Sequence, residues 1–247
     1  MNWLIDLGNT RLKCAALTDA GTPGTVRAFA HADADAMQQL AVHLGQADEG
    51  DEVWLASVAS LSLTEALVAV ALASGYRVHR VRTTAVHGSL QVAYAEPARL
   101  GVDRFLAMLA ATARSDGPWV IVSVGSALTV DALARDGRHL GGLIAPTPLH
   151  MREALAERFP VMDLPAGRAR DFAADTADAV ASGARAAALG LVERSLRLAQ
   201  EHFGMRPTLL LSGGGADALD ELAYEPSVSC PMLVLEGLAR FASSREN

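Results

Sequence analysis

The chain has 247 residues, of which 51% are hydrophobic, 20% are charged and 5% are aromatic. This composition excludes disorder as the main state and supports a sizeable core, in one large domain or two small ones. The formal net charge of −7 argues against the broad basic surface that non-specific nucleic-acid binders need. Cys14 and Cys230 form no CxxC pair, so neither a disulfide framework nor a cysteine-based zinc site is expected. This cysteine usage fits the reducing cytoplasm.

Neither a signal peptide nor a membrane span is expected. The first residues lack the basic region of a signal peptide. The stretch 53–73 carries a single charge, Glu65, and is long enough to span a bilayer. Serines interrupt the stretch, however, and Ser62 with Glu65 matches a capping box. We therefore expect a buried strand at 53–58 and a helix at 63–74.

Apolar periodicity and turn residues predict an alternation of strands and helices along the chain. The expected strands, in chain order, are 3–7, 11–17, 53–58, 76–81, 119–122, 127–133, 140–144 and 208–211. The expected helices are 34–44, 63–74, 102–114, 151–158, 177–203 and 233–242. Residues 160–174, with two prolines and several charges, are expected to form a loop.

The opening pattern of the chain returns in its second half. Gly8 and Gly125 occupy matching turns, 117 residues apart, and each turn lies between two predicted strands. An offset near half of the chain indicates duplication of one α/β unit rather than a solenoid, whose period would be shorter. We therefore expect two halves, 1–116 and 117–247.

The turn Asp6-Leu-Gly-Asn-Thr10 allows two interpretations. In the first, the glycine frees backbone N–H groups to face an anion, while Asn9, Thr10 and Lys13 add donors. The Asp6 carboxylate then makes sense if Mg²⁺, bound through water, lies between it and a phosphate. In the second, this is an ordinary hairpin turn with local hydrogen bonds. A similar turn at Gly125-Ser126 favours the first interpretation, because two such turns can hold one polyphosphate.

Two further segments keep both a functional and a structural interpretation. The glycine-rich turn 212–215, between a strand and a helix, suits either a polar nucleotide edge or a plain connection. Gly101 is expected to open a helix with Asp103 and Arg104 in its first turn, where Asp is usually a cap. Alternatively, Asp103 is a base near a substrate hydroxyl, and Arg104 binds a carboxylate or phosphate.

Other common catalytic signatures are missing from the sequence. It contains no Walker-type phosphate loop, no nucleophile elbow and no GxGxxG motif. The seven histidines show no HxxxH or HxE spacing, so no zinc site is expected. We interpret these histidines as surface or structural residues.

Taken in order, these motifs resemble those of the type III pantothenate kinases, which phosphorylate pantothenate at the first step of coenzyme A synthesis. The most specific match is Tyr94-x-x-Pro97-x-x-x-Gly101-x-Asp103-Arg104. The turn 6–10 resembles the first phosphate loop of the family, and Gly125-Ser126-Ala127-x-Thr129-x-Asp131 resembles the second. Weaker matches follow at Gly141-Gly142, Asp175-Thr176 and Gly213-Gly214, so the resemblance covers most of the chain.

The resemblance implies an α/β fold of two duplicated ribonuclease H-like (actin-like ATPase) halves, with ATP in the cleft between them. It also implies that Asp103 is the catalytic base and that Thr176 contacts pantothenate from the partner subunit of a homodimer. Sequence alone would interpret Thr176 as a residue near a helix N-cap. The residues implied to shape the pantothenate pocket are Tyr94, Gly101, Val102, Asp103 and Arg104. Those implied to bind ATP are Asp6, Leu7, Gly8, Asn9, Thr10, Arg11, Leu12, Lys13 and Ser126.

Two departures from the family pattern concern the second phosphate loop. The family commonly has an Asp at the position of Ser123, where it helps to bind a monovalent cation, potassium or ammonium. Ser123 offers that cation no carboxylate. Ser126 stands where Thr is usual and keeps the hydroxyl. Since Asp6 and Asp103 are retained, the resemblance implies an active kinase that uses ATP and Mg²⁺.

Two alternative functions remain open at this point. The first is a non-catalytic accessory regulator of transcription on the same fold, motivated by the charge lost at Ser123 and compatible with a protein partner. The second keeps the fold but changes the substrate to a sugar or a small acid. The match over 94–104 weighs against this second alternative. No nucleic-acid or membrane partner is expected in any of these cases.

Overall fold

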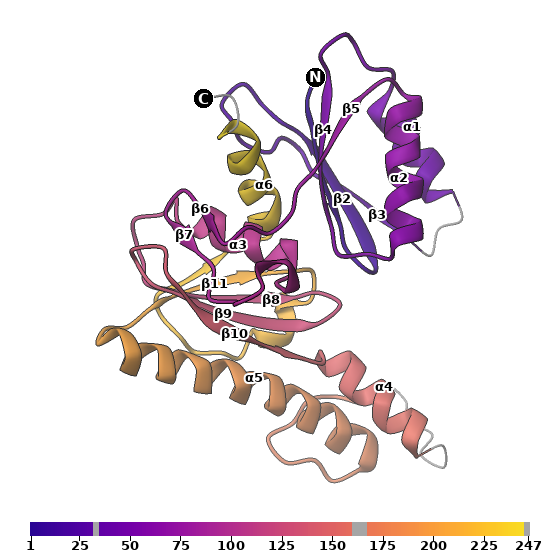
Figure 1. Cartoon of the computed structure of the whole chain (residues 1–247). Coiled ribbons are helices and arrows are strands. Elements are labelled where there is room, and N and C mark those ends of the chain that lie inside the picture. Colours follow the sequence, from indigo (N-terminus) through magenta and orange to yellow (C-terminus); the bar gives the residue numbers. More distant parts are fainter. Residues whose placement is uncertain (32–34, 160–166, 245–247) are drawn as a thin grey trace. The chain divides into compact units, whose positions relative to one another are not determined.

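The structure is a computed structural model that describes residues 1–31, 35–159 and 167–244 (Figure 1). The chain forms two compact units. The first unit contains Met1–Ser115, Asp136–His139 and Met232–Asn247, and the second contains Asp116–Arg135 and Leu140–Pro231. The halves 1–116 and 117–247 were defined by duplication, which packing alone does not test, so they stay a prediction.

The first unit is built on a five-stranded sheet in the order β3-β2-β1-β4-β5. Its strands are β1 (Trp3–Leu7), β2 (Arg11–Ala16), β3 (Arg27–Ala30), β4 (Glu52–Ser57) and β5 (Arg77–Arg80). A small hairpin adds β6 (Val86–His87) and β7 (Leu90–Gln91). The helices are α1 (Ala36–Leu44), α2 (Leu61–Ala73), α3 (Val102–Ala111) and α6 (Leu233–Ser243), with a 3-10 turn, η1, at Pro97–Arg99.

Strand β1 shows how the two faces of this sheet differ. Trp3, Ile5 and Leu7 pack into one core with α1 and α2. The alternation of a strand directs Leu4 and Asp6 to the opposite face, where α6 contacts β1 and β4. Figure 1 shows α1 and α2 on one side of the sheet and α6 on the other. Asp6 therefore belongs to the face that α6 partly covers.

Helix α3 is held against α6 at very short range. A Cβ atom on Gly237 of α6 would overlap the backbone carbonyl of Leu106 in α3. Only glycine allows this approach, because any other residue would push the two helices apart. The position of α3 in the first unit therefore depends on the last helix of the chain.

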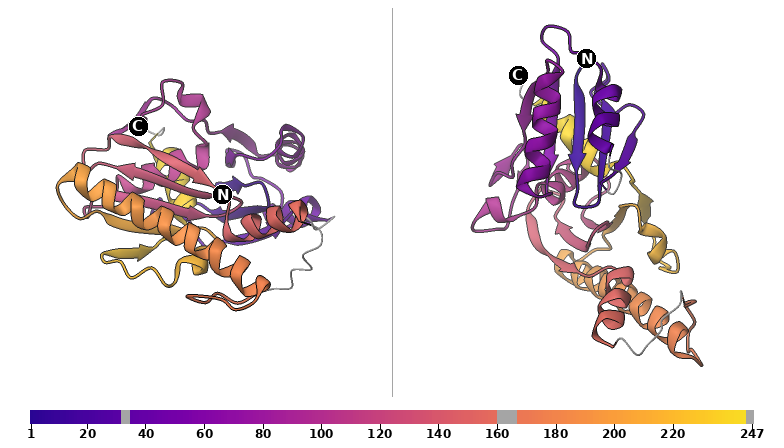
Figure 2. Two further views of the ribbon diagram at one scale, coloured as in Figure 1. Left: turned by 90° about the horizontal axis from the view of Figure 1, so that it is seen from below. Right: turned by 90° about the vertical axis from the view of Figure 1, so that its right-hand side faces the viewer.

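The second unit repeats the sheet, in the order β10-β9-β8-β11-β12. Its strands are β8 (Trp119–Val124), β9 (Leu128–Leu133), β10 (His139–Ala145), β11 (Thr208–Ser212) and β12 (Ser227–Ser229). The helices are α4 (Pro148–Arg158) and α5 (Thr176–Phe203), with a 3-10 turn, η2, at Ala216–Leu219. In Figure 2, α5 runs along one face of this sheet, where it packs on Val120, Val122 and Val124.

Both sheets place their first strand in the centre. In each, the second strand pairs antiparallel with the first, and the fourth strand pairs parallel on its other side. The fifth strand then adds parallel to the fourth. The shared strand order confirms the predicted α/β fold with two similar halves.

Some local predictions were wrong. Helix α2 begins at Leu61, and its cap is Ser60, whose hydroxyl accepts from the backbone N–H of Leu63, rather than the predicted Ser62 box. Helix α4 begins at Pro148, three residues early, because Thr147 caps it and proline suits the first helical position. The turn 212–215 leads to η2 rather than to an α-helix. Of the predicted loop 160–174, residues 160–166 lie outside the described residues.

The stretch 53–73 forms most of β4 and all of α2, as the capped interpretation predicted. Among the described residues, no helix is both long and apolar enough to cross a membrane. Cys14 and Cys230 are both buried, and neither forms a disulfide. Burial raises the pKa of the Cys14 thiol to about 12, so this cysteine stays protonated at neutral pH.

Candidate active site

The first predicted phosphate turn connects β1 to β2. The backbone N–H of Gly8 donates to the Arg11 carbonyl at 3.1 Å, which closes the turn, and Asn9 and Thr10 are exposed at its tip. His31 holds this tip from outside: its backbone N–H donates to the Thr10 carbonyl, and its Nδ1 lies 3.1 Å from the Asn9 carbonyl oxygen. Sequence reasoning gave His31 no role, since nothing in its spacing connects it to the turn.

Asp6 occupies the end of β1, directly opposite Lys13 of β2. The pKa of Asp6 is raised to about 7, mainly because burial removes water from its carboxylate. Repulsion from the Asp103 carboxylate raises the pKa further, and the Lys13 ammonium acts in the opposite direction. The fold therefore places the carboxylate of Asp103, far away in sequence, where it interacts electrostatically with Asp6 in the first unit.

Asp103 lies in the first turn of α3, as predicted. Its Oδ1 accepts a hydrogen bond from the backbone N–H of Arg104 at 2.9 Å, and the N-terminal end of the helix favours its negative charge. Gly101, the residue before α3, leaves room for this carboxylate. A Cβ atom there would lie 2.5 Å from Oδ1 of Asp103.

Tyr94 and Arg104 are joined beside this carboxylate. Nη1 of Arg104 donates to the Tyr94 hydroxyl at 3.1 Å, and the guanidinium carbon lies 5.8 Å from the centre of the tyrosine ring. Arg104 is only 6% exposed. Gly101 and Val102 line a cavity of about 430 Å³ in the first unit, whose wall also carries Arg80, Arg82 and Arg99.

The carboxylates of Asp6 and Asp103 fit a Mg²⁺ ion, which prefers oxygen ligands and neutralises repelling charges. Within the described residues, no group of three or more histidine, cysteine or acidic side chains could hold a metal by itself. Such an ion would therefore need oxygens from phosphates and water in addition to the protein, as is usual for Mg²⁺ in nucleotide enzymes.

The second predicted phosphate turn connects β8 to β9. The backbone N–H of Gly125 donates to the Ala127 carbonyl at 3.0 Å, and Ser126 is exposed. Ser123 lies opposite Thr129 on one side and Ser212 on the other. This turn thus carries a row of hydroxyl groups across three strands where the first turn carries a charged pair.

The structure distributes the predicted residues over its two units. Within the first unit it joins Asp6, Lys13, Asp103, Arg104 and Tyr94. Leu7 and Leu12, predicted to contact ATP, are fully buried, so only their backbone groups are available to a ligand.

Ser123, Ser126 and Thr176 belong to the second unit. Thr176 is the exposed first residue of α5, whose cap is Asp175. It lines an apolar cavity of about 680 Å³ along α4 and α5, together with Met151, Leu155 and Val180.

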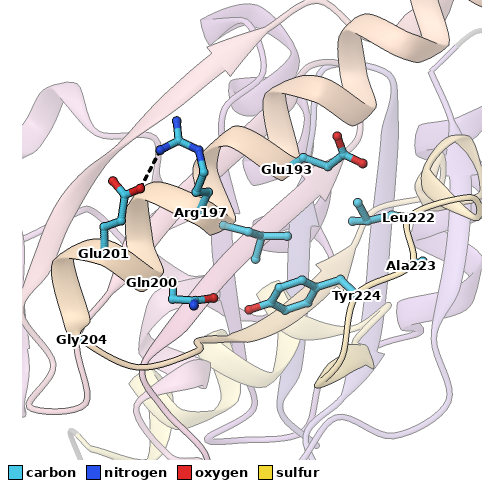
Figure 3. Close-up of a pocket in the computed structure, with 9 residues that line it drawn as sticks. Glu193, Arg197, Gln200, Glu201, Gly204, Leu222, Ala223 and Tyr224 are labelled. Carbon is cyan, nitrogen blue, oxygen red and sulfur yellow. Dashed lines mark hydrogen bonds and ion pairs between the residues drawn. The ribbon is translucent and has the colours of Figure 1, made fainter.

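A third cavity, of about 490 Å³, lies near the end of α5 (Figure 3). Leu222 and Tyr224 face α5 across it, and its rim carries the ion pair between Arg197 and Glu201, whose atoms lie 2.7 Å apart. The cavity contains none of the residues predicted from sequence, so we assign it no part in the chemistry.

Known proteins match this sequence over most of its length. A family model described as type III pantothenate kinase matches residues 2–198. A curated type III pantothenate kinase from Stenotrophomonas maltophilia (strain K279a) is 45% identical over 245 residues, which cover 98% of this chain and 97% of that protein. Another, from Xanthomonas euvesicatoria pv. vesicatoria (strain 85-10), is 44% identical over 98% of this chain and 97% of that protein.

Solved structures support the fold. A Campylobacter jejuni protein named as a Baf family transcriptional activator is 18% identical, has a TM-score of 0.61, and aligns over 99% of both chains. A ROK family glucokinase from Streptomyces griseus, solved with glucose and AMPPNP, is 10% identical, has a TM-score of 0.52, and aligns over 98% of this chain and 99% of its own. Identities this low show the fold alone. The family model and the curated relatives go further, and by them the chain belongs to the type III pantothenate kinase family.

Proposed function

We propose that this protein transfers the γ-phosphoryl group of ATP to the hydroxyl group of pantothenate, the first step of coenzyme A biosynthesis. The observation that carries this proposal is the arrangement at the start of α3. There the Asp103 carboxylate interacts with Asp6, and the buried Arg104 is bonded to Tyr94. Membership of the type III pantothenate kinase family supports the same activity.

We further propose that ATP is bound by residues 6–13 and by the hydroxyl of Ser126. The backbone of the first turn offers N–H groups to phosphate, and the Lys13 ammonium adds a positive charge. Asp6 would hold Mg²⁺ through water, and the ion would neutralise charge on the transferred phosphoryl group. The raised pKa of Asp6 supports this role, because burial and then the Asp103 carboxylate disfavour the negative charge, which a divalent cation would stabilise.

Asp103 acts as the base in this mechanism. The pantothenate oxygen forms a bond to the γ-phosphorus while the bond to the bridging oxygen breaks, ADP leaves, and Asp103 takes the hydroxyl proton. A carboxylate is a weak base, but phosphoryl transfer has a loose transition state in which the proton can leave late. The backbone N–H of Arg104, 2.9 Å from Oδ1, holds the carboxylate in one orientation.

Pantothenate is an anion, and its proposed pocket is cationic. Arg104 offers a nearly buried guanidinium, a group that pairs well with a carboxylate. The cavity beside Gly101 and Val102 adds Arg80, Arg82 and Arg99 to its wall. The arginines of the cavity support the assignment of Gly101 and Val102 to pantothenate, and the buried guanidinium supports that of Arg104 and its partner Tyr94.

We also propose a homodimer in which Thr176 of one subunit contacts pantothenate in the other. The support is an apolar surface on the second unit that a monomer would leave in water: Ile144, Leu149 and Phe172 are 65%, 57% and 98% exposed. The apolar cavity that Thr176 lines belongs to the same region of α4 and α5. Sedimentation of the wild-type protein and of Leu155→Glu tests this: we expect a dimer and a monomer, respectively.

Two further proposals concern the setting of the reaction. We expect only a weak requirement for potassium or ammonium, because Ser123 provides no carboxylate and its neighbours Thr129 and Ser212 provide only hydroxyls. We place the enzyme in the cytoplasm, consistent with two cysteines that form no disulfide. The alternative of a non-catalytic transcription regulator has no support from the family model or from the curated relatives.

The experiment that tests the proposed function measures ADP release from ATP with and without pantothenate, at neutral pH with Mg²⁺, while potassium is varied from zero. We expect ADP formation that depends on pantothenate. Replacing the base, Asp103→Asn, should lower kcat by about 10²–10⁴-fold. Normal turnover in this variant would exclude Asp103 as the base.

A matched control is Asp35→Asn, which changes a carboxylate at the start of α1 that makes no capping hydrogen bond. This variant should keep wild-type kinetics. Thermal unfolding of both variants checks that neither substitution acts through the fold.

A further inference from the structure

Besides Arg104, one more side chain of the first unit stacks on the ring of Tyr94. The imidazole ring of His139 has its centre 6.1 Å from the tyrosine ring, and the two planes are 15° apart, which is an offset stack. His139 is only 2% exposed. Nothing in the sequence connects this histidine to Tyr94, because the two lie 45 residues apart along the chain.

His139 also contacts the backbone that leads into Tyr94. The N–H of Ala93 donates to Nδ1 of His139 at 3.4 Å, a long hydrogen bond. The same imidazole therefore restrains Tyr94 twice, through its ring and through the preceding residue.

The turn that presents His139 is itself fixed to the segment before Tyr94. The backbone N–H of Gln91 donates to the Gly137 carbonyl at 2.9 Å, and Gln91 forms a parallel bridge with Arg138. Gly137 has a φ of +88°, and a Cβ atom there would overlap the backbone of Ser89. Both the backbone conformation and the close approach require glycine, so the turn has little freedom to shift.

These contacts form a chain that ends at the proposed pantothenate site. His139 contacts Tyr94, and Tyr94 accepts the hydrogen bond of Arg104. A half-exposed tyrosine can rotate its side chain, and rotation would break the bond to Arg104. Stacking on a buried, backbone-anchored imidazole removes that freedom.

We propose that His139 is a positioning residue for pantothenate binding: it fixes the ring of Tyr94 and, through it, the guanidinium of Arg104. This inference rests on the proposed role of Tyr94 and Arg104 in the pantothenate pocket. It assigns no contact between His139 and the substrate.

Two substitutions separate the stacking contact from the hydrogen bond. His139→Phe keeps a flat ring and loses the acceptor, whereas His139→Asn keeps an acceptor near the position of Nδ1 and loses the ring. We expect His139→Asn to raise KM for pantothenate about three- to tenfold, the range of an aromatic stacking contact. We expect His139→Phe to stay within about twofold of wild type, because the stack is retained. In both, kcat and KM for ATP should change little.

The matched control is His79→Asn, which removes another stacked histidine of the first unit. The His79 ring lies 4.4 Å from the Trp54 ring, with the planes 17° apart, and its Nε2 contacts Glu52 at 2.9 Å. This substitution should lower thermal stability without raising KM for pantothenate. If His139→Asn does not fold, His139→Leu removes the ring while filling its volume, and it carries the same expectation.

Tyr94→Phe and Arg104→Gln distinguish this inference from the site on which it depends. If both leave KM for pantothenate unchanged, the proposed pantothenate pocket is wrong. If they raise it while the ring-free His139 variants do not, the pocket stands and the positioning role of His139 is wrong. An equal rise in KM for ATP in the His139 variants would also overturn the positioning role, because it would indicate general disruption.

Discussion

The turns β1–β2 and β8–β9 have the same place in their sheets but different chemistry. Each follows the central strand, and each closes with a backbone hydrogen bond from its glycine. The residue before the last in the central strand is Asp6 in one unit and Ser123 in the other. Across the hairpin, Asp6 faces Lys13, whereas Ser123 faces Thr129. The same backbone arrangement thus carries charged side chains in the first unit and hydroxyl side chains in the second.

This difference indicates that the two turns have different roles. The β1–β2 turn, called the charged turn here because it carries Asp6 and Lys13, interacts electrostatically with Asp103. Repulsion between the carboxylates of Asp6 and Asp103 makes this region suitable for a divalent cation. The hydroxyls of Ser123, Thr129 and Ser212 can donate hydrogen bonds to phosphate but carry no charge that would balance a metal ion. We therefore expect the two turns to respond very differently to equivalent substitutions.

The largest expected effect comes from neutralising the charged turn. Asp6→Asn should lower kcat for pantothenate-dependent ADP release by about 10²–10³-fold, because it removes preorganised electrostatic stabilisation. The matched change in the other turn, Ser123→Ala, removes one neutral hydrogen-bonding group and should cost less than about tenfold. Equal losses of kcat in the two variants would contradict the proposed difference between the turns.

Thermal unfolding provides the control for Asp6→Asn. The raised pKa of Asp6 means that its charged form is disfavoured in the folded protein. Above pH 7 the neutral asparagine should therefore leave stability unchanged or increase it. A strong loss of stability would show that the kinetic effect came from the fold.

An intermediate effect is expected when a carboxylate is added to the hydroxyl turn. Ser123→Asp places a charge beside Thr129 and Ser212, and together these groups offer oxygen ligands to a potassium ion. The increase in kcat/KM caused by potassium should then be about tenfold larger in the variant than in the wild type. This factor is equivalent to about 1.4 kcal/mol. Ser123→Asn, of similar size and without charge, should keep the wild-type response. A potassium response shared by all three proteins would contradict this expectation.

The smallest expected effect concerns the stability of the first unit and its dependence on pH. In the first unit, the His43 ring packs against Trp3 at 5.0 Å, and Arg27 donates to its Nδ1 at 3.2 Å. Burial, and then the charge of Arg27, lower the pKa of His43 below 6.5. His43 borders the first core through Trp3, and neither of the core clusters described for the two units contains a histidine itself. Stability of the first unit should thus decrease as pH falls below 6.5, because the unfolded chain takes up the proton first.

Urea unfolding at pH 7 and pH 5.5, followed by tryptophan fluorescence, measures this difference. Trp3 fluorescence reports on the unfolding of the first unit. Trp119→Phe, introduced into every protein compared, removes the fluorescence of the second unit. His43→Gln should reduce the loss of the urea midpoint between the two pH values. An unchanged pH dependence in this variant would assign the effect to other groups.

The fold was largely predictable because its elements have strong local signals. The apolar run of β8 and the long periodic pattern of α5 gave nearly correct bounds. Short strands were missed: β3, β6, β7 and β12 have four residues or fewer, and pairing with a neighbour rather than local preference makes them strands. The cap of α2 was misplaced because Ser60 and Ser62 are both suitable caps, and only the backbone geometry decides between them.

The candidate site was predictable only where a motif carried it. Asp103 and Arg104 were found together because they are adjacent in a specific pattern. Interaction of Asp103 with Asp6 depends on the packing of α3, which no local pattern encodes. His31 and His139 were missed because each contacts the site through backbone or ring geometry, and a lone histidine in sequence has no distinguishing spacing.

The contact between Gly237 and Leu106 has a consequence for how the enzyme matures. Helix α3 carries the proposed base, and the surface it packs on is α6, made of residues 233–243. Since a chain emerges from the ribosome N-terminus first, every residue assigned to chemistry above is synthesised before that surface exists. A chain cut short before Leu233 would keep the whole catalytic motif and lack the helix that holds it. The helix that carries the proposed base therefore has its packing surface only once residues 233–243 have been synthesised and have folded against it.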